Sequence, residues 1–93
     1  MTTSPAAQAT SRIFGFATRV TVDSPDNNAV SSALGDLVEM MLDADGFVRL
    51  DITVGEVRAA ALDVIVGYPD DSVVVGAALY EFFQLIAKAS SVV

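Results

Sequence analysis

The C-terminal segment, residues 73–93, is apolar over most of its length and places the strongest constraint on the fold. Glu81, Gln84 and Lys88 interrupt it, whereas a membrane span requires about 20 residues with few or no charges, so we expect no span. On a helix these three residues leave one narrow polar stripe. A helix with so little polar surface has to be covered on more than one side. We therefore expect one side to pack on the protein's own core and another to meet a second subunit.

The composition of the whole chain leads to the same expectation. The chain has 93 residues, of which 53% are hydrophobic, and its mean hydropathy is +0.54. A single domain of this size buries only about 64% of the surface of its unfolded chain, so it normally needs a more polar composition. Burial of one face in a homo-oligomer, with a dimer as the simplest form, resolves this mismatch.

Aromatic residues on the predicted C-terminal helix, residues 71–90, point in different directions. Successive residues of a helix are about 100° apart, so Phe82 and Phe83 diverge and Tyr80 points elsewhere again. At least one ring is expected at the edge of the core, where half-exposed aromatic residues commonly anchor protein interfaces. Gly76 lies in a run of small residues that lets another backbone approach. The predicted self-association surface consists of Val75, Gly76, Leu79, Tyr80, Phe82, Phe83 and Ile86.

The N-terminal part of the chain is predicted to change from a flexible tail to an ordered domain. Residues 1–11 are small and polar and show no hydrophobic period, so we predict a flexible tail, with residues 12–93 as a single domain. Residues 12–23 alternate between apolar and polar side chains and are rich in β-branched and aromatic residues. This pattern is typical of a strand.

The next segments predict a helix followed by two strands. Ser24 and Pro25 match the cap and first residue of a helix, and a single apolar stripe over residues 30–42 makes this helix amphipathic. Residues 47–54 alternate and predict a second strand. Residues 57–66 are ambiguous, because their apolar residues fit one face of a helix or the return strand of a hairpin. Their β-branched end favours the strand, which we predict, with the helix left open.

The predicted order of elements is strand, helix, strand, strand, helix. This order defines an α+β fold: a β-α-β-β-α two-layer sandwich with a three-stranded sheet and two helices on one face. The topology resembles a ferredoxin-like plait that lacks its last strand. ACT domains, which are regulatory ligand-binding modules, share that plait, although their usual glycine at the first strand–helix junction is replaced here by residues 24–28. The resemblance implies a regulatory domain that holds a small ligand between subunits.

The chain contains no histidine and no cysteine, which excludes most catalytic and metal chemistry. Neither a Ser-His-Asp triad nor a Cys-His pair can form, and there can be no disulfide, thiolate or imidazole site. The run Asp43-Ala44-Asp45-Gly46 matches the centre of a calcium-binding EF-hand loop, but the register places Met41 and Ile52 where that loop needs carboxylates. We predict an ordinary turn there, no metal, no cofactor and no enzymatic activity.

The chain is strongly acidic, with twelve acidic and five basic residues, a net charge of −7 and a pI near 4.1. A surface this negative repels phosphates, so we expect no nucleic-acid partner. Most of these charges are scattered and favour solubility. The predicted partner-facing acidic surface consists of Asp36, Glu39, Asp43, Asp45, Asp70 and Asp71.

These features favour a non-enzymatic protein-interaction module that self-associates through its C-terminal helix and presents an acidic surface to another protein. One alternative is a regulatory domain that senses a small molecule at the subunit interface. Another is an acidic inhibitor of a nucleic-acid-binding protein, of the kind that a phage or mobile element encodes. The first residues lack the basic and apolar regions of a signal peptide and the chain lacks cysteine, so we expect a cytoplasmic protein.

Overall fold

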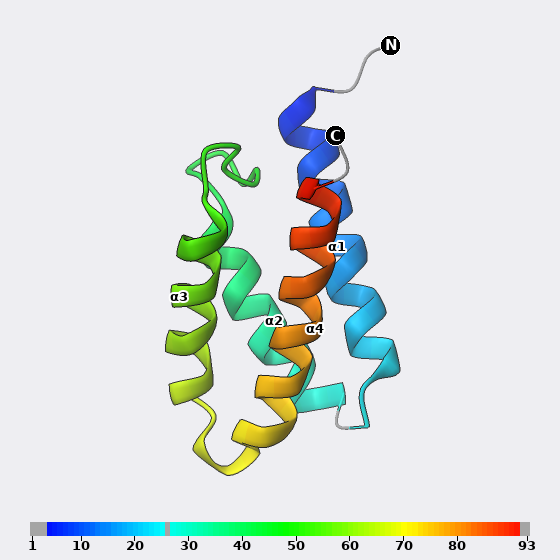
Figure 1. The fold of residues 1–93 in the computed structure, drawn as a ribbon, viewed down its shortest axis with the longest axis vertical. Helices are drawn as coiled ribbons and strands as arrows, with labels where there is room; N and C mark the ends of the chain where they lie inside the picture. Colours follow the sequence, from blue (N-terminus) through cyan, green and yellow to red (C-terminus); the bar gives the residue numbers. More distant parts are fainter. Residues whose placement is uncertain (1–3, 26, 92–93) are drawn as a thin grey trace.

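The computed structural model of the protein describes residues 4–25 and 27–91 and shows a bundle of helices (Figure 1). These two ranges contain no strand, and their one β-type contact is an isolated antiparallel bridge between Leu42 and Val48. The predicted α+β sandwich, with its three-stranded sheet and ferredoxin-like topology, is therefore wrong. The elements are α1 (Pro5–Asp23), α2 (Asn27–Met41), α3 (Val54–Val66), the short 3-10 helix η1 (Pro69–Asp71) and α4 (Ser72–Ser91).

The four α-helices run alternately up and down along the long axis of the molecule (Figure 1). α2 and α4 contact each other at the centre, α1 packs against both from one side, and α3 packs against both from the other. The loop of residues 42–53 joins α2 to α3 at the end of the bundle where α1 begins. The turn that contains η1 joins α3 to α4 at the opposite end. Since α3 has 13 residues, it separates these two connections by about 20 Å.

α1 replaces the strand predicted at residues 12–23. Its buried residues, Ile13 and Val20, lie seven positions apart, which is the spacing of two helical turns. The helix accommodates its threonines because each hydroxyl donates to the carbonyl oxygen four residues earlier. These hydrogen bonds join Thr10 to Ala6 (2.7 Å), Thr18 to Phe14 (2.9 Å) and Thr21 to Ala17 (2.8 Å). The apolar–polar alternation is misleading here, because burial does not follow every second residue.

α1 also begins earlier than the predicted domain. Ser4 caps its N-terminus, with the hydroxyl oxygen accepting from the Ala7 N–H at 3.1 Å, and Pro5 occupies the first helical position. Residues 5–11, predicted as part of a flexible tail, form the first turns of α1, so the predicted tail boundary falls inside a helix. Residues 1–3 of that tail lie outside the described residues.

α2 confirms the helix predicted from a single apolar stripe. The stripe is buried as expected: Val30, Ala33, Leu34, Leu37, Val38 and Met41. The predicted start is wrong, because Ser24 and Pro25 precede the helix rather than open it. Ser24 instead ends α1, with its N–H donating to the Thr21 carbonyl oxygen at 3.2 Å and its hydroxyl to the Val20 carbonyl oxygen at 2.6 Å.

α3 occupies the ambiguous segment, so the predicted strand over residues 57–66 is wrong and the helix alternative is right. A capping box starts the helix: the Glu56 N–H donates to Thr53 Oγ1 at 3.1 Å, and the Thr53 N–H donates to Glu56 Oε1 at 3.1 Å. Its buried residues are Val57, Ala61 and Val64, at helical spacing. The cap supplies the local signal that outweighs the β-branched end of the segment.

The loop between α2 and α3 replaces the strand predicted over residues 47–54. Val48 is its one fully buried residue, and the Val48 N–H donates to Thr10 Oγ1 of α1 at 2.8 Å. The Arg49 N–H donates to the Met41 carbonyl oxygen at 2.9 Å. The loop is therefore tied to both α1 and α2.

α4 confirms the predicted C-terminal helix. Its core-facing stripe comprises Val75, Ala78, Leu79, Phe82 and Ile86, all buried. Across the described parts of the chain every buried side chain is apolar, so any functional group has to be sought at the surface.

Candidate functional site

α4 carries a second apolar stripe in addition to the one that faces the core. Positions spaced by three and four residues lie on one side of a helix. The second stripe follows this spacing and consists of Val73, Gly76, Tyr80, Phe83 and Ala87. Val73 is 84% exposed and Tyr80 63% exposed, and the other three are partly buried. Phe83 packs partly against the core, whereas core packing does not account for the exposed Val73 and Tyr80.

α3 runs beside the second stripe of α4 and contributes a partly apolar stripe of its own. Arg58, Leu62 and Ile65 lie at positions i, i+4 and i+7, and Leu62 is 59% exposed. Between the two helices is an open groove of about 370 Å³. This α3–α4 groove is lined by Arg58, Ala61, Leu62, Ile65, Gly76, Leu79, Tyr80 and Phe83.

Gly76 lies in the α3–α4 groove without being needed for the contact between the two helices. A methyl group placed on its α-carbon meets Ile65 Cδ1 at 3.9 Å, which is an ordinary van der Waals distance. Packing within the chain would therefore accept alanine at this position, although glycine in a helix costs about 1 kcal/mol relative to alanine. Glycine at position 76 keeps the groove open at this point, and the packing of the four helices does not require it.

The structure divides the seven predicted interface residues into two groups. Val75, Leu79, Phe82 and Ile86 are buried in the chain's own core, although Leu79 also reaches the floor of the groove. Gly76, Tyr80 and Phe83 line the groove at the surface. The prediction missed α3, because a segment taken as a strand could not supply Leu62 and Ile65 at helical spacing.

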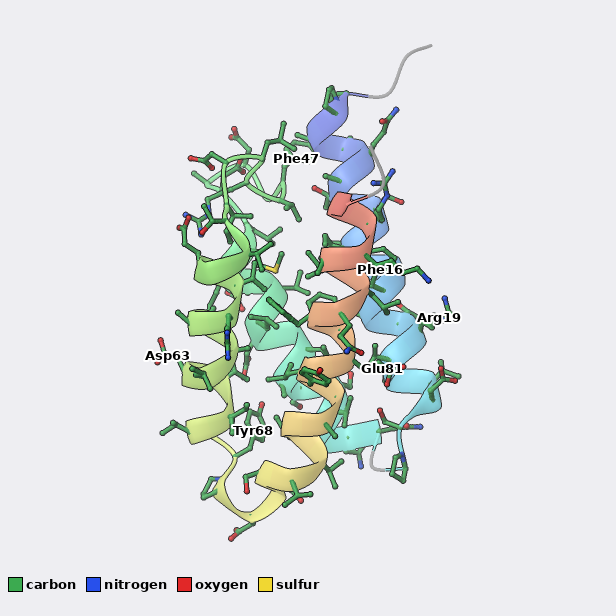
Figure 2. All side chains as sticks on the ribbon, in the orientation of Figure 1. Phe16, Arg19, Phe47, Asp63, Tyr68 and Glu81 are labelled. Atoms are coloured by element: carbon green, nitrogen blue, oxygen red, sulfur yellow. The ribbon has the colours of Figure 1, made fainter. Side chains whose placement is uncertain are left out.

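The predicted acidic residues do not gather into one surface. Asp43 and Asp45 lie in the loop at one end of the bundle, whereas Asp70 and Asp71 lie in η1 at the other end. Figure 2 shows this separation through Phe47, close to the first pair in sequence, and Tyr68, close to the second. Asp36 and Glu39 project from the exposed side of α2 between these ends.

Asp36 takes part in a side-chain contact between distant parts of the chain. The Tyr68 hydroxyl donates to Asp36 Oδ2 at 2.9 Å and links α2 to the turn after α3. This hydrogen bond, together with partial burial and the negative charge of Asp36, raises the pKa of Tyr68 above its usual value of 10.0. The hydrogen bond connects two elements of the bundle. It does not bring the other acidic residues of the set together.

The Asp43–Gly46 segment forms a turn in which the carboxylate binds backbone groups. Asp43 Oδ1 accepts from the Asp45 N–H at 2.9 Å and from the Phe47 N–H at 3.1 Å. Gly46 has a φ of 85°, which glycine adopts without strain. Within residues 4–25 and 27–91 no group of three acidic, histidine or cysteine side chains is placed to hold a metal ion.

The segment Pro69–Ala89, which comprises η1 and most of α4, is long and apolar enough to cross a membrane by length and composition alone. A core helix of a soluble protein passes the same test, and α4 packs against the three other α-helices. The absence of a span and the cytoplasmic location stay predictions.

Comparisons with protein-family models, with curated proteins and with solved structures give no match to this chain. The function is therefore argued from the geometry of the chain itself.

Proposed function

We propose that the protein is a non-enzymatic protein-interaction module that self-associates through the α3–α4 groove. One observation carries this proposal: the second apolar stripe of α4 reaches the groove through Tyr80, which is 63% exposed, and Phe83, and the core covers it only in part. Large exposed apolar patches on small domains commonly mark sites of protein association. The occupant that fits best is a second copy of this chain.

Charge supports a second copy as the occupant of the groove. Two molecules with a net charge of −7 repel each other over most of their surfaces. Of the residues that line the groove, Arg58 is the charged one, and no acidic residue is among them. Two copies can therefore approach through this face with less repulsion than through the acidic side of α2.

The size of the face sets the expected strength of the dimer. α3 is about 20 Å long, and two packed helices present a face roughly 20 Å wide. Such a face covers about 400 Å², roughly half of the 800 Å² per partner that a standard specific interface buries, which is the size of a weak, transient contact. We therefore expect a reversible dimer with a dissociation constant on the order of micromolar.

Tyr80 and Phe83 are the expected anchors of this dimer. Aromatic residues at the centre of an apolar patch contribute most to binding in protein interfaces. Dimerisation through the groove leaves the acidic residues of α2 and of the two bundle ends accessible, including Asp36, Glu39 and Asp70. We propose that Asp36 and Glu39, which share the exposed side of α2, meet a second, basic protein partner.

Analytical ultracentrifugation over a concentration series tests the self-association. We expect Tyr80→Glu and Phe83→Glu to raise the dissociation constant by at least about 30-fold, because each places a charge in a desolvated apolar contact. Val22→Glu on α1 is the matched control, since Val22 is 71% exposed and lies outside the groove. A wild-type protein that stays monomeric up to about 1 mM contradicts the proposal, as does a Val22→Glu variant that dissociates equally.

A further inference from the structure

The loop of residues 42–53 lies at the end of the bundle where α1 begins and α4 ends (Figure 1). A second cavity is lined by residues of this loop and of these helices. It has a volume of about 200 Å³ and shares no lining residue with the α3–α4 groove. Its walls are mainly apolar and include Ile13, Phe16, Val57 and Ile86. The cavity is partly open to solvent, and its volume leaves room for the apolar body of a small ligand.

Two arginines line this cavity. Arg12 comes from α1 and Arg49 from the loop, and together they are two of only five basic residues in the chain. No acidic residue lines the cavity. In a protein with a net charge of −7, two guanidinium groups beside one apolar pocket create a local preference for an anion.

Arg49 is held in place by its backbone while its side chain is incompletely paired. The Arg49 N–H donates to the Met41 carbonyl oxygen at 2.9 Å, and the adjacent Val48 N–H donates to Thr10 Oγ1 at 2.8 Å. In the side chain, Nη2 reaches the Met40 carbonyl oxygen at 3.4 Å, and Nε is buried without a hydrogen-bond partner. Buried donors nearly always have a partner, so the unpaired Nε leaves part of the hydrogen-bonding capacity of the Arg49 guanidinium unused.

Glu56 lies close enough to Arg49 for their charges to interact, and its carboxylate is committed to the cap of α3. Glu56 Oε1 accepts from the Thr53 N–H at 3.1 Å and from the Thr53 hydroxyl at 3.0 Å. These hydrogen bonds lower the pKa of Glu56 more than the charge of Arg49 does. Glu56 therefore leaves the guanidinium of Arg49 able to pair with another anion.

We infer that this cavity binds a small anionic amphiphile, a carboxylate carried on an apolar body of roughly six to eight carbons. The body packs against Ile13, Phe16 and Ile86, and the carboxylate pairs with Arg12 and Arg49. Guanidinium groups suit this role because their planar donors match the two oxygens of a carboxylate. The apolar walls select for the body, and the two arginines select for the negative charge.

Calorimetric titration of the full chain with octanoate tests this inference. We expect saturable binding of octanoate, and binding of octanol and octylamine at least about tenfold weaker, because neither carries a negative charge. Arg12→Gln and Arg49→Gln should each weaken octanoate binding at least about tenfold. Arg19→Gln is the matched control, since Arg19 lies on the same helix as Arg12 and points away from the bundle in Figure 2.

Three results overturn the inference: no saturable binding of octanoate up to about 10 mM, equal affinity for octanoate and octanol, or arginine variants that bind as Arg19→Gln does. Circular dichroism of each variant establishes that it is folded. If Arg49→Gln does not fold, Arg12→Gln decides the question, because Arg12 is exposed and its replacement leaves the core intact. Failure here leaves the self-association proposal standing, since the groove shares no residue with this cavity.

Discussion

α2 and α4 are the two central helices of the bundle and contact each other, yet their outer surfaces differ. α2 buries one apolar stripe, and apart from Met40, which is 45% exposed, the rest of its surface carries exposed polar residues such as Ser31, Ser32 and Glu39. α4 buries a comparable stripe and also keeps a second one at the surface, through Val73 and Tyr80.

The difference shows that a helix can be apolar for two reasons: packing in the core of the monomer and association with another molecule. Core packing accounts for the apolar stripe of α2, as it does for Val75, Leu79 and Phe82 of α4. It does not account for Tyr80, because an exposed ring contributes little to the stability of the monomer. Apolar surface that the core does not need favours association, so α4 has to be explained by the dimer as well as by the monomer.

The largest losses of stability are expected from truncation of buried side chains in the two core stripes. In this respect α2 and α4 should behave alike. Phe82→Ala in α4 and Leu37→Ala in α2 each truncate a side chain that is fully buried. We expect the free energy of unfolding to fall by about 3–5 kcal/mol for Phe82→Ala and about 2–5 kcal/mol for Leu37→Ala. Urea denaturation followed by circular dichroism measures both. A loss below about 1 kcal/mol at either position would contradict its place in the core.

Replacement of a helical glycine tests the outer surfaces of the same two helices. Gly76→Ala in α4 and Gly35→Ala in α2 should each stabilise the monomer by up to about 1 kcal/mol, because the new methyl group meets no close neighbour. In ultracentrifugation, only Gly76→Ala should change the dissociation constant of the dimer. An equal change for Gly35→Ala would show that the groove is not the interface.

The smallest change in stability is expected from loss of the hydrogen bond on the polar side of α2. Tyr68→Phe removes the hydrogen bond to Asp36 and should lower the free energy of unfolding by about 0.5 kcal/mol. Because the pKa of Tyr68 is raised in the folded state, its contribution to stability is complete below pH 10 and is lost as the pH rises above 10. Thermal melts at pH 8 and pH 11 check this, since Tyr68→Phe should remove that part of the alkaline loss.

α2 and α4 could be predicted from the sequence because each buries residues at helical spacing over a long segment. α1 and α3 could not be predicted from hydrophobic period, since α1 buries only Ile13 and Val20 and α3 is short and ends in β-branched residues. The decisive local signals were the caps: Ser4 before Pro5, and Thr53 three residues before Glu56.

The candidate site was predictable only in part. An excess of apolar surface on α4 follows from the sequence; Tyr80 is exposed at the surface, whereas Phe83 is partly buried. Which side of α4 faces the core depends on how the other helices pack. The sequence alone therefore could not separate the buried Val75 and Phe82 from the groove residues Tyr80 and Phe83. The cavity between Arg12 and Arg49 forms only when the loop folds back on α1, and no short sequence motif encodes that contact.

A dilution series of amide NMR spectra tests the central claim most directly, because it reports both whether the chain associates and through which residues. Between about 1 mM and about 10 µM, the amide signals of Leu62, Tyr80 and Phe83 should shift, while those of Phe14 and Val22 on α1 stay constant. Spectra that do not change with concentration would contradict the account, as would shifts confined to the α1–α2 side of the bundle.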